Sequence, residues 1–180
     1  MKILAISGSL RAASSNTAAL RAAALLAPEG VEIAFYGGLG DLPHFNPDLE
    51  DSEPAAVTDF RARVREADGL LISSPEYAHG VPGVMKNALD WLVSGSEFID
   101  MPVALINATP PATYSQASLT ETLTVMSAHL VTEASISLPL RGRKLDAAGI
   151  AADPGMAEAL RAAIDAFVRA IPSIPRFRPE

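Results

Sequence analysis

Five short apolar runs alternate with stretches of helical periodicity, and this alternation constrains the fold more than any other feature of the chain. We expect strands at 2–7, 31–36, 69–73, 102–108 and 131–138. Apolar residues at three- and four-residue steps, or an Ala/Leu-rich composition, predict helices near 16–26, 57–67, 81–92, 119–130 and 156–167. Strict alternation with near-continuous apolar strands predicts an α/β fold, a doubly wound parallel sheet with helices on both faces.

The length of 180 residues fits one domain, which we place at 1–171, followed by a Pro-rich C-terminal tail at 172–180. Five strands favour a flavodoxin-like five-stranded sheet in the order 2-1-3-4-5. Such sheets bind ligands beyond the carboxyl ends of their strands. The site is therefore expected in the loops that follow the first, third and fourth strands.

Composition argues against several classes of site. The chain has no cysteine for a thiolate site, and its three histidines are scattered, which does not favour a transition-metal site. A net charge of −7 argues against general nucleic-acid binding, which needs clustered Lys and Arg. No apolar stretch approaches the ~20 residues of a membrane span, and the amino terminus does not resemble a signal peptide. We therefore expect a cytoplasmic protein without a membrane span.

The loop after the first strand, GSLRAASSN at 8–16, has the composition of an anion site. Hydroxyl and amide side chains come from Ser9, Ser14, Ser15, Asn16 and Thr17. A helix begins directly behind them, and its N-terminus favours a phosphate group. Arg11 adds a permanent positive charge. A capped turn with Arg11 facing water is the structural alternative, but capping accounts for only one or two of these residues.

The type of phosphate follows from what the loop lacks. It matches neither G-x-x-x-x-G-K-[ST] nor G-x-G-x-x-G, so it is not a standard nucleoside-triphosphate or dinucleotide loop. A phosphate monoester at the switch point of a flavodoxin-like sheet would be that of FMN.

A second motif, SPEYAHGVPGVMKNALDW at 74–91, follows the third strand. Backbone N–H groups at 75–77 can face a flavin ring, and Tyr77 can form one wall of a pocket. Glu76 also admits a structural role, as the cap of a turn or as a partner across a subunit boundary. Trp91 is expected in the core or in an interface.

Together, GSLRxxSxN and PEYxxGxPGxxKNAxDW resemble the motifs of the NADPH-dependent FMN reductases, flavodoxin-like enzymes that include quinone, azo-dye and chromate reductases. The resemblance extends over nearly the whole chain. It implies a phosphate loop made of Ser9, Arg11, Ser14, Ser15, Asn16 and Thr17. It assigns Pro75, Glu76 and Tyr77 to the isoalloxazine site. The loop after the fourth strand departs from the family, because it has two prolines and no glycine. Flavin or substrate could be contacted there by side chains instead, from Thr109, Thr113, Tyr114, Ser115 or Gln116.

The resemblance also implies an activity. NADPH or NADH would deliver hydride to flavin N5, and a quinone, free flavin or other small oxidant would then take the electrons in a ping-pong reaction. Because the cofactor supplies the reactivity, no catalytic side chain or metal is expected. A homodimer or homotetramer would complete the flavin sites. Two other classes stay open, a flavodoxin-type electron carrier and a flavodoxin-like interaction protein without a cofactor.

Overall fold

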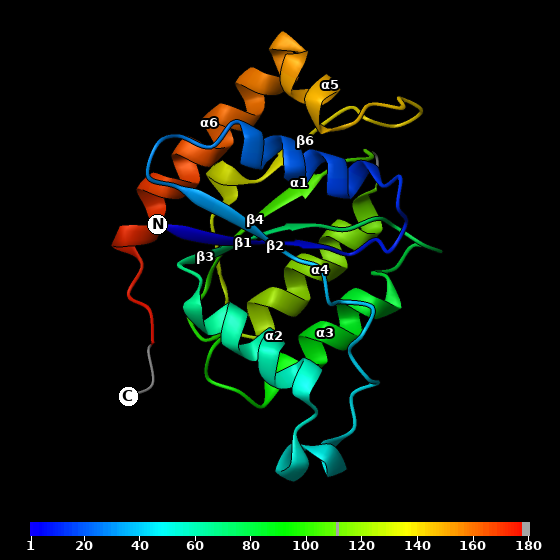
Figure 1. Cartoon of the computed structure of the whole chain (residues 1–180), viewed down its shortest axis with the longest axis vertical. Coiled ribbons are helices and arrows are strands. Elements are labelled where there is room, and N and C mark those ends of the chain that lie inside the picture. Colours follow the sequence, from blue (N-terminus) through cyan, green and yellow to red (C-terminus); the bar gives the residue numbers. More distant parts are fainter. Residues whose placement is uncertain (111, 178–180) are drawn as a thin grey trace.

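The computed structural model describes residues 1–110 and 112–177, and its strands run parallel in the order β2-β1-β3-β4-β5 that the sequence predicts (Figure 1). The strands are β1 (Lys2–Ser7), β2 (Glu32–Tyr36), β3 (Gly69–Ser73), β4 (Pro102–Asn107), β5 (His129–Leu130) and β6 (Ile136–Ser137). Every residue of β3 and β4 is buried, which explains why these two strands consist almost wholly of apolar residues.

The predicted strand at 131–138 is wrong in position and in continuity: β5 lies before it, at His129–Leu130, where the sequence predicts the end of a helix, and only β6 falls inside it. β5 pairs with the start of β4 and β6 with its end, and a 3₁₀ turn, Thr132–Ala134, separates them. At the interruption Leu105 N donates to Ser135 Oγ over 3.1 Å. A serine side chain thus replaces a backbone acceptor, which apolar periodicity cannot reveal. Within the described residues the sheet therefore has six strands rather than five.

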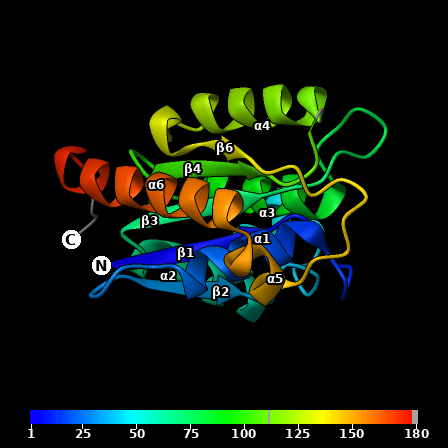
Figure 2. The same cartoon turned by 90° about the horizontal axis from the view of Figure 1, so that it is seen from above.

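Helices cover both faces of the sheet, as predicted (Figures 1 and 2). One layer contains α1 (Ser15–Leu25), α5 (Ala147–Ala152) and α6 (Pro154–Ala170), and the other contains α2 (Ala55–Glu66), α3 (Gly83–Val93) and α4 (Thr113–Val125). Successive residues of β1 alternate between the layers: Leu4 and Ile6 pack in the α2–α4 core, and Ile3 and Ala5 in the other. In the described part of the chain no helix has the length and apolar character needed to cross a membrane.

Trp91 lies in the core of the monomer. Its side chain has no exposed surface, and its Nε1 donates to Pro43 O over 2.8 Å. The ring of Phe45 meets it edge to face, with centroids 5.1 Å apart. Of the two locations expected for Trp91 the structure selects the core, so this residue gives no support to a subunit interface.

Arg61 of α2 joins several segments beneath the sheet. Its Nε and Nη2 donate to Trp91 O over 3.0 and 2.7 Å, at the end of α3. Its Nη1 lies 2.8 Å from Glu53 Oε2. Its Nε also lies 3.3 Å from Oε1 of Glu97, whose side chain is only 2% exposed. The charge of Glu97 is therefore tolerated in the interior because Arg61 accompanies it.

The C-terminal segment continues past α6 along the amino-terminal edge of the sheet. Ile174 packs against the core on the α1/α6 side. Arg176 Nη2 donates to the carbonyl oxygens of Val64 and Arg65, both over 3.2 Å. The described part of the predicted tail is thus attached to the end of α2, whereas 178–180 lie outside the described residues.

Candidate functional site

The loops after β1 and β3 meet at the carboxyl edge of the sheet, on the right in Figure 1. β1 and β3 pair in parallel, and Ser7 is opposite Ser73 in the register. Both strands therefore end at the same level. The chain then turns into α1 on one side and α3 on the other, which is the switch point expected for a ligand.

Gly8 allows this close approach. Its N–H donates to Ser73 O over 2.9 Å. A Cβ at position 8 would lie 2.3 Å from Ser74 Oγ and 2.9 Å from Ser74 Cβ, closer than atoms can pack. Because Ser74 is itself buried, it has little room to move. The glycine of the GSLR motif is therefore required by packing against the second loop.

Gly8→Ala is expected to lower the free energy of unfolding by about 1–2 kcal/mol, as overpacking of a close contact does. The added methyl group would push the ends of β1 and β3 apart. Urea unfolding followed by circular dichroism measures the change. Ser74→Gly in the same chain removes both clashing atoms and should restore part of the loss. No recovery in the double variant would mean that the clash with Ser74 is not the cause.

The first loop is organised by its own serines. Ser14 is the N-cap of α1, and its Oγ accepts from Thr17 N over 3.3 Å. Ser9 Oγ accepts from Arg11 N over 3.4 Å. Thr17 Oγ1 lies 2.8 Å from Ser7 Oγ at the end of β1. The loop is thus held in shape, while the first N–H groups of α1 keep no acceptor within the helix.

Asn16 behaves differently from the other predicted phosphate residues. Its side chain is buried, and its Oδ1 accepts from Ser73 Oγ over 2.9 Å. Ser73 Oγ also lies 2.7 Å from the carbonyl oxygen of Ile106 in β4. The side-chain oxygen of Asn16 therefore links the first loop to β3 and β4.

A cavity of about 920 Å³, called here the α1 cavity, opens beside this loop. The predicted phosphate residues that line it are Arg11, Ser14, Ser15 and Thr17, whereas Ser9 and Asn16 do not. No carboxylate occurs between positions 8 and 17. Hydroxyl groups, a guanidinium and a helix N-terminus form a set of donors that fits the dianionic phosphate of FMN.

The second loop offers fewer backbone donors than its sequence suggested. Pro75 is buried and has no N–H. Tyr77 N donates to Gly80 O over 3.2 Å, and Gly80 N donates to Tyr77 O over 2.9 Å. No described residue accepts a hydrogen bond from Glu76 N. Of the three expected N–H donors, only that of Glu76 can still face a flavin ring.

The carboxylate of Glu76 caps a helix from outside. Its Oε2 accepts from Ser115 N over 2.9 Å, in the first turn of α4. The N-cap residue of α4 is Ala112, which makes no side-chain cap. Of the two structural roles weighed for Glu76, the cap is the one found. The loop after β3 thereby holds the start of the helix that follows β4.

Glu76→Ala is expected to lower the free energy of unfolding by about 0.5–2 kcal/mol, the usual cost of a lost helix cap. Glu76→Gln keeps an acceptor oxygen, so its free energy of unfolding should fall by less. Thermal unfolding of the two variants beside the parent protein measures both effects. Equal losses for Ala and Gln would contradict the hydrogen bond as the source of the stabilisation.

The third loop packs beside the second. Thr109 is partly exposed after β4, and its N–H donates to Asn107 Oδ1 over 3.2 Å. The ring of Tyr114 stacks on that of His79, with centroids 4.2 Å apart. Thr109 therefore lies at the same edge of the sheet as Pro75–Tyr77, while Pro111 of this loop is outside the described residues.

Comparison with known proteins identifies the family. Residues 1–141 match the family described as NADPH-dependent FMN reductase. The chain belongs to this family. An NAD(P)H-dependent FMN reductase of Pseudomonas aeruginosa is 33% identical over 173 residues, which are 93% of each protein. A quinone reductase of Escherichia coli strain K12 is 36% identical over 106 residues, 58% of this chain and 55% of that protein.

Solved structures agree with this family. FerB, a flavoenzyme NAD(P)H:(acceptor) oxidoreductase from Paracoccus denitrificans, superposes with a TM-score of 0.79 at 29% identity and covers 96% of this chain and 98% of its own. An NADH:FMN oxidoreductase in its apo form superposes with a TM-score of 0.68, covering 97% of this chain and 90% of its own. That structure is 23% identical to this chain and supports the fold alone.

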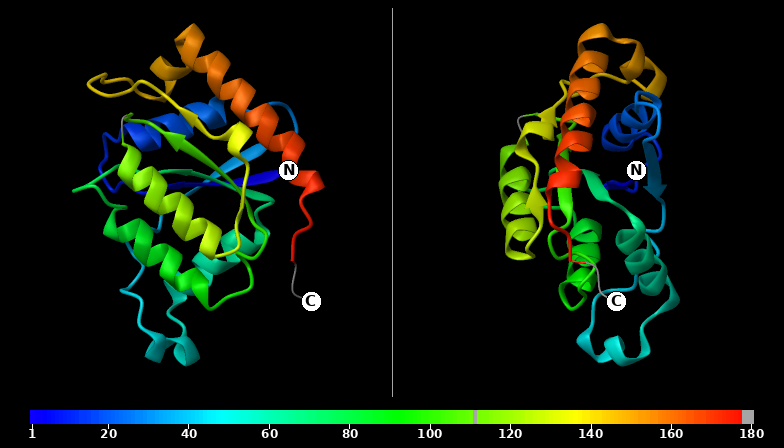
Figure 3. Two further views of the ribbon diagram at one scale, coloured as in Figure 1. Left: turned by 180° about the vertical axis from the view of Figure 1, so that it is seen from behind. Right: turned by 90° about the vertical axis from the view of Figure 1, so that its left-hand side faces the viewer.

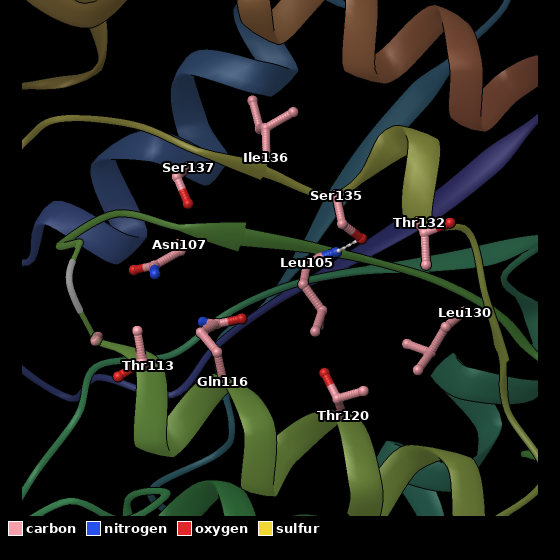
Figure 4. Close-up of a pocket in the computed structure, with 11 residues that line it drawn as sticks. Leu105, Asn107, Thr113, Gln116, Thr120, Leu130, Thr132, Ser135, Ile136 and Ser137 are labelled. Carbon is pink, nitrogen blue, oxygen red and sulfur yellow. Dashed lines mark hydrogen bonds between the residues drawn. The ribbon is translucent and has the colours of Figure 1, made fainter.

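This FMN reductase family member has a second, uncharged pocket of about 350 Å³ between α4 and the edge formed by β4, β5 and β6 (Figure 4). Polar side chains of both elements project toward it, among them Asn107, Gln116, Thr120 and Ser137. Leu105, Leu130 and Ile136 supply its apolar part. A phosphate has no cationic partner among the residues that line this pocket, so of these two cavities the α1 cavity suits a phosphorylated cofactor better.

The prediction from sequence missed part of the α1 cavity. Arg21 lines it from the second turn of α1, and Arg143 and Lys144 line it from the loop after β6. The basic run RGRK at 141–144 was the available signal. Nothing in the sequence links this run to a loop 130 residues earlier, because only the fold brings the segments together.

Proposed function

We propose that this protein is an FMN-dependent NAD(P)H oxidoreductase, which takes electrons from NADPH or NADH and passes them to a quinone, free flavin or other small oxidant. The observation that carries the proposal is the family match combined with a loop of hydrogen-bond donors at the switch point of the sheet. The named activities of the P. aeruginosa and E. coli relatives support the same reaction class.

In this proposal the phosphate of FMN lies at the N-terminus of α1, between Arg11 and the serines at 9, 14 and 15. Thr17 contributes from the first turn of the helix. Asn16 contributes its backbone N–H, since the oxygen of its side chain already accepts from Ser73. The charge of Arg11 and the helix dipole both favour the dianion at this position.

The ring of FMN then extends toward Pro75–Tyr77 and Thr109. When bound, FMN supplies the hydride chemistry of the reaction. The chain orients the ring: buried Pro75 fixes the exit of β3, Glu76 N–H faces the ring edge, and exposed Tyr77 forms a wall. Glu76 is not an acid or base in this scheme, because its carboxylate caps α4.

The visible spectrum tests the proposal. The protein mixed with FMN should retain flavin absorbance after gel filtration, and anaerobic NADPH or NADH should bleach it. Bound flavin that neither nicotinamide reduces would instead favour the flavodoxin-type electron carrier. A protein that remains colourless in excess FMN would favour the interaction protein without a cofactor.

A homodimer or homotetramer belongs to the same proposal, as does a cytoplasmic location. Support comes from large apolar side chains that are exposed on α3 and α4, namely Val93, Tyr114 and Val125. These two helices lie side by side on the outer surface of one layer (Figure 3). Sedimentation velocity at several protein concentrations determines the state of association, and a monomer at all of them would overturn this part.

A further inference from the structure

We propose that the α1 cavity contains a second phosphate site, separate from that of FMN, which binds the 2′-phosphate of NADPH. This inference rests on the proposed function, since it concerns the nucleotide that the reaction consumes. It also makes the chain selective for NADPH over NADH, because the two nucleotides differ only in that phosphate group.

The α1 cavity is larger than a single phosphate group requires. Its lining follows α1 from Ser15 as far as Leu25. At 1.5 Å per residue this is a length of about 15 Å, several times the width of a phosphate group. A phosphate bound at the N-terminus of α1 therefore fills one end and leaves most of the 920 Å³ available.

The remaining wall of the cavity is rich in cations. Arg21, Arg143 and Lys144 line it in a chain whose net charge is −7. Lys144 forms no ion pair with any residue that the structure describes, and Arg21 lies over the ring of Phe35, 5.8 Å from its centroid. Such a concentration of cations in an acidic protein favours a polyanionic ligand.

The other charged groups of this wall leave the cations available. Arg143 Nη2 lies 3.5 Å from Asp153 Oδ2, but its side chain is 47% exposed and retains further donors. Asp146 supplies the carboxylate among the lining residues. Its Oδ1 accepts from Gly149 N over 2.8 Å as the cap of α5. This carboxylate is thus held by a helix N-terminus, which partly offsets its repulsion of an anion.

The location suits the substrate. The nicotinamide ring has to lie against the flavin at the carboxyl edge, so the phosphorylated adenosine must extend away from it. The α1 cavity starts at the proposed FMN phosphate and leads outward between α1 and 142–148. This second wall lies beyond the family match, which ends at residue 141.

Direct binding tests the site without turnover. Calorimetric titration with 2′,5′-ADP should give a tighter complex than 5′-AMP, both with and without FMN. In Arg21→Gln/Lys144→Gln that preference should fall by about tenfold, as expected when charged hydrogen bonds to phosphate are lost. Arg141→Gln is the matched control, since this exposed arginine belongs to the same basic run but does not line the cavity.

Steady-state kinetics provides the second readout. The double variant should raise KM for NADPH by about tenfold while KM for NADH and kcat stay unchanged, because it removes only ground-state binding to the extra phosphate. Equal binding of 2′,5′-ADP and 5′-AMP by the parent protein would overturn the inference. So would an equal loss in Arg141→Gln, which would indicate a general charge effect. The inference would also be overturned if the double variant raised only the KM for free FMN as electron acceptor. The Arg21/Lys144 wall would then bind the phosphate of that acceptor.

The two proposals fail in different ways. If the protein does not bind FMN, or if neither nucleotide bleaches the flavin, the proposed oxidoreductase is wrong. The titration of the protein with 2′,5′-ADP still decides whether the Arg21/Lys144 wall binds a phosphate. Conversely, if NADPH and NADH reduce the flavin without preference, the proposed oxidoreductase is supported and the second phosphate site is wrong.

Discussion

Replacing Arg11 with alanine is expected to weaken FMN binding by about 1.5–3 kcal/mol, or roughly 10- to 150-fold in Kd. Arg11 lines the α1 cavity, and no described residue forms an ion pair with it. Its guanidinium is therefore free to pair with the phosphate of FMN. Because the free protein does not use this charge, the variant should unfold at the same urea concentration as the parent.

Quenching of flavin fluorescence on binding measures the Kd. Arg141→Ala removes the same charge from an exposed position outside the cavity and should change the affinity little, which separates a direct contact from the overall field of the protein. The Kd of Arg11→Lys for FMN should lie between those of Arg11→Ala and Arg141→Ala, since lysine keeps the charge but lacks the forked donor geometry. An unchanged Kd for FMN in Arg11→Ala would contradict the proposed phosphate site in this loop.

The largest effect on stability is expected for Arg61→Met, which should lower the free energy of unfolding by about 3–5 kcal/mol. The variant leaves the carboxylate of Glu97 in the interior without its nearest cation, 3.3 Å away. A further cation, Arg65 Nη2, lies 4.0 Å from this carboxylate, but its side chain is mostly exposed. The variant also removes both hydrogen bonds to Trp91 O.

Urea unfolding tests this prediction, with Arg63→Met as a control on the same helix. Arg63 pairs with Asp59 over 3.3 Å, but both side chains are more than half exposed, so the expected loss is below about 0.5 kcal/mol. Arg61→Met/Glu97→Met should recover part of the stability, because it also removes the unpaired carboxylate of Glu97 from the interior. Similar losses for Arg61→Met and Arg63→Met would show that the interior ion pair contributes little.

The central sheet was predictable because its strands are buried on both faces and alternate with helices of clear period. The edge was less predictable. Ser135 looks like any polar residue in an alternating strand, yet its hydroxyl accepts from Leu105 N and so permits the break between β5 and β6. Helix α5 was missed because six residues are too few to display a helical period.

The candidate site was likewise predictable only in part. The loop at 8–17 has its chemistry in consecutive residues, so its composition alone predicted a phosphate site. The direction of a side chain is a tertiary property, so composition does not show that the side chains of Asn16 and Glu76 contact Ser73 and Ser115. Lys144 was missed because it reaches the cavity from a distant segment.

The division of the outer strand has a consequence for solubility. A long, straight strand at the rim of a sheet offers a row of free amide and carbonyl groups, onto which a strand of another molecule can add. Here that rim consists of two-residue pieces, β5 and β6, with a 3₁₀ turn between them. An incoming strand would find no continuous template on this side. The break thus protects the molecule against fibril-like growth from this rim.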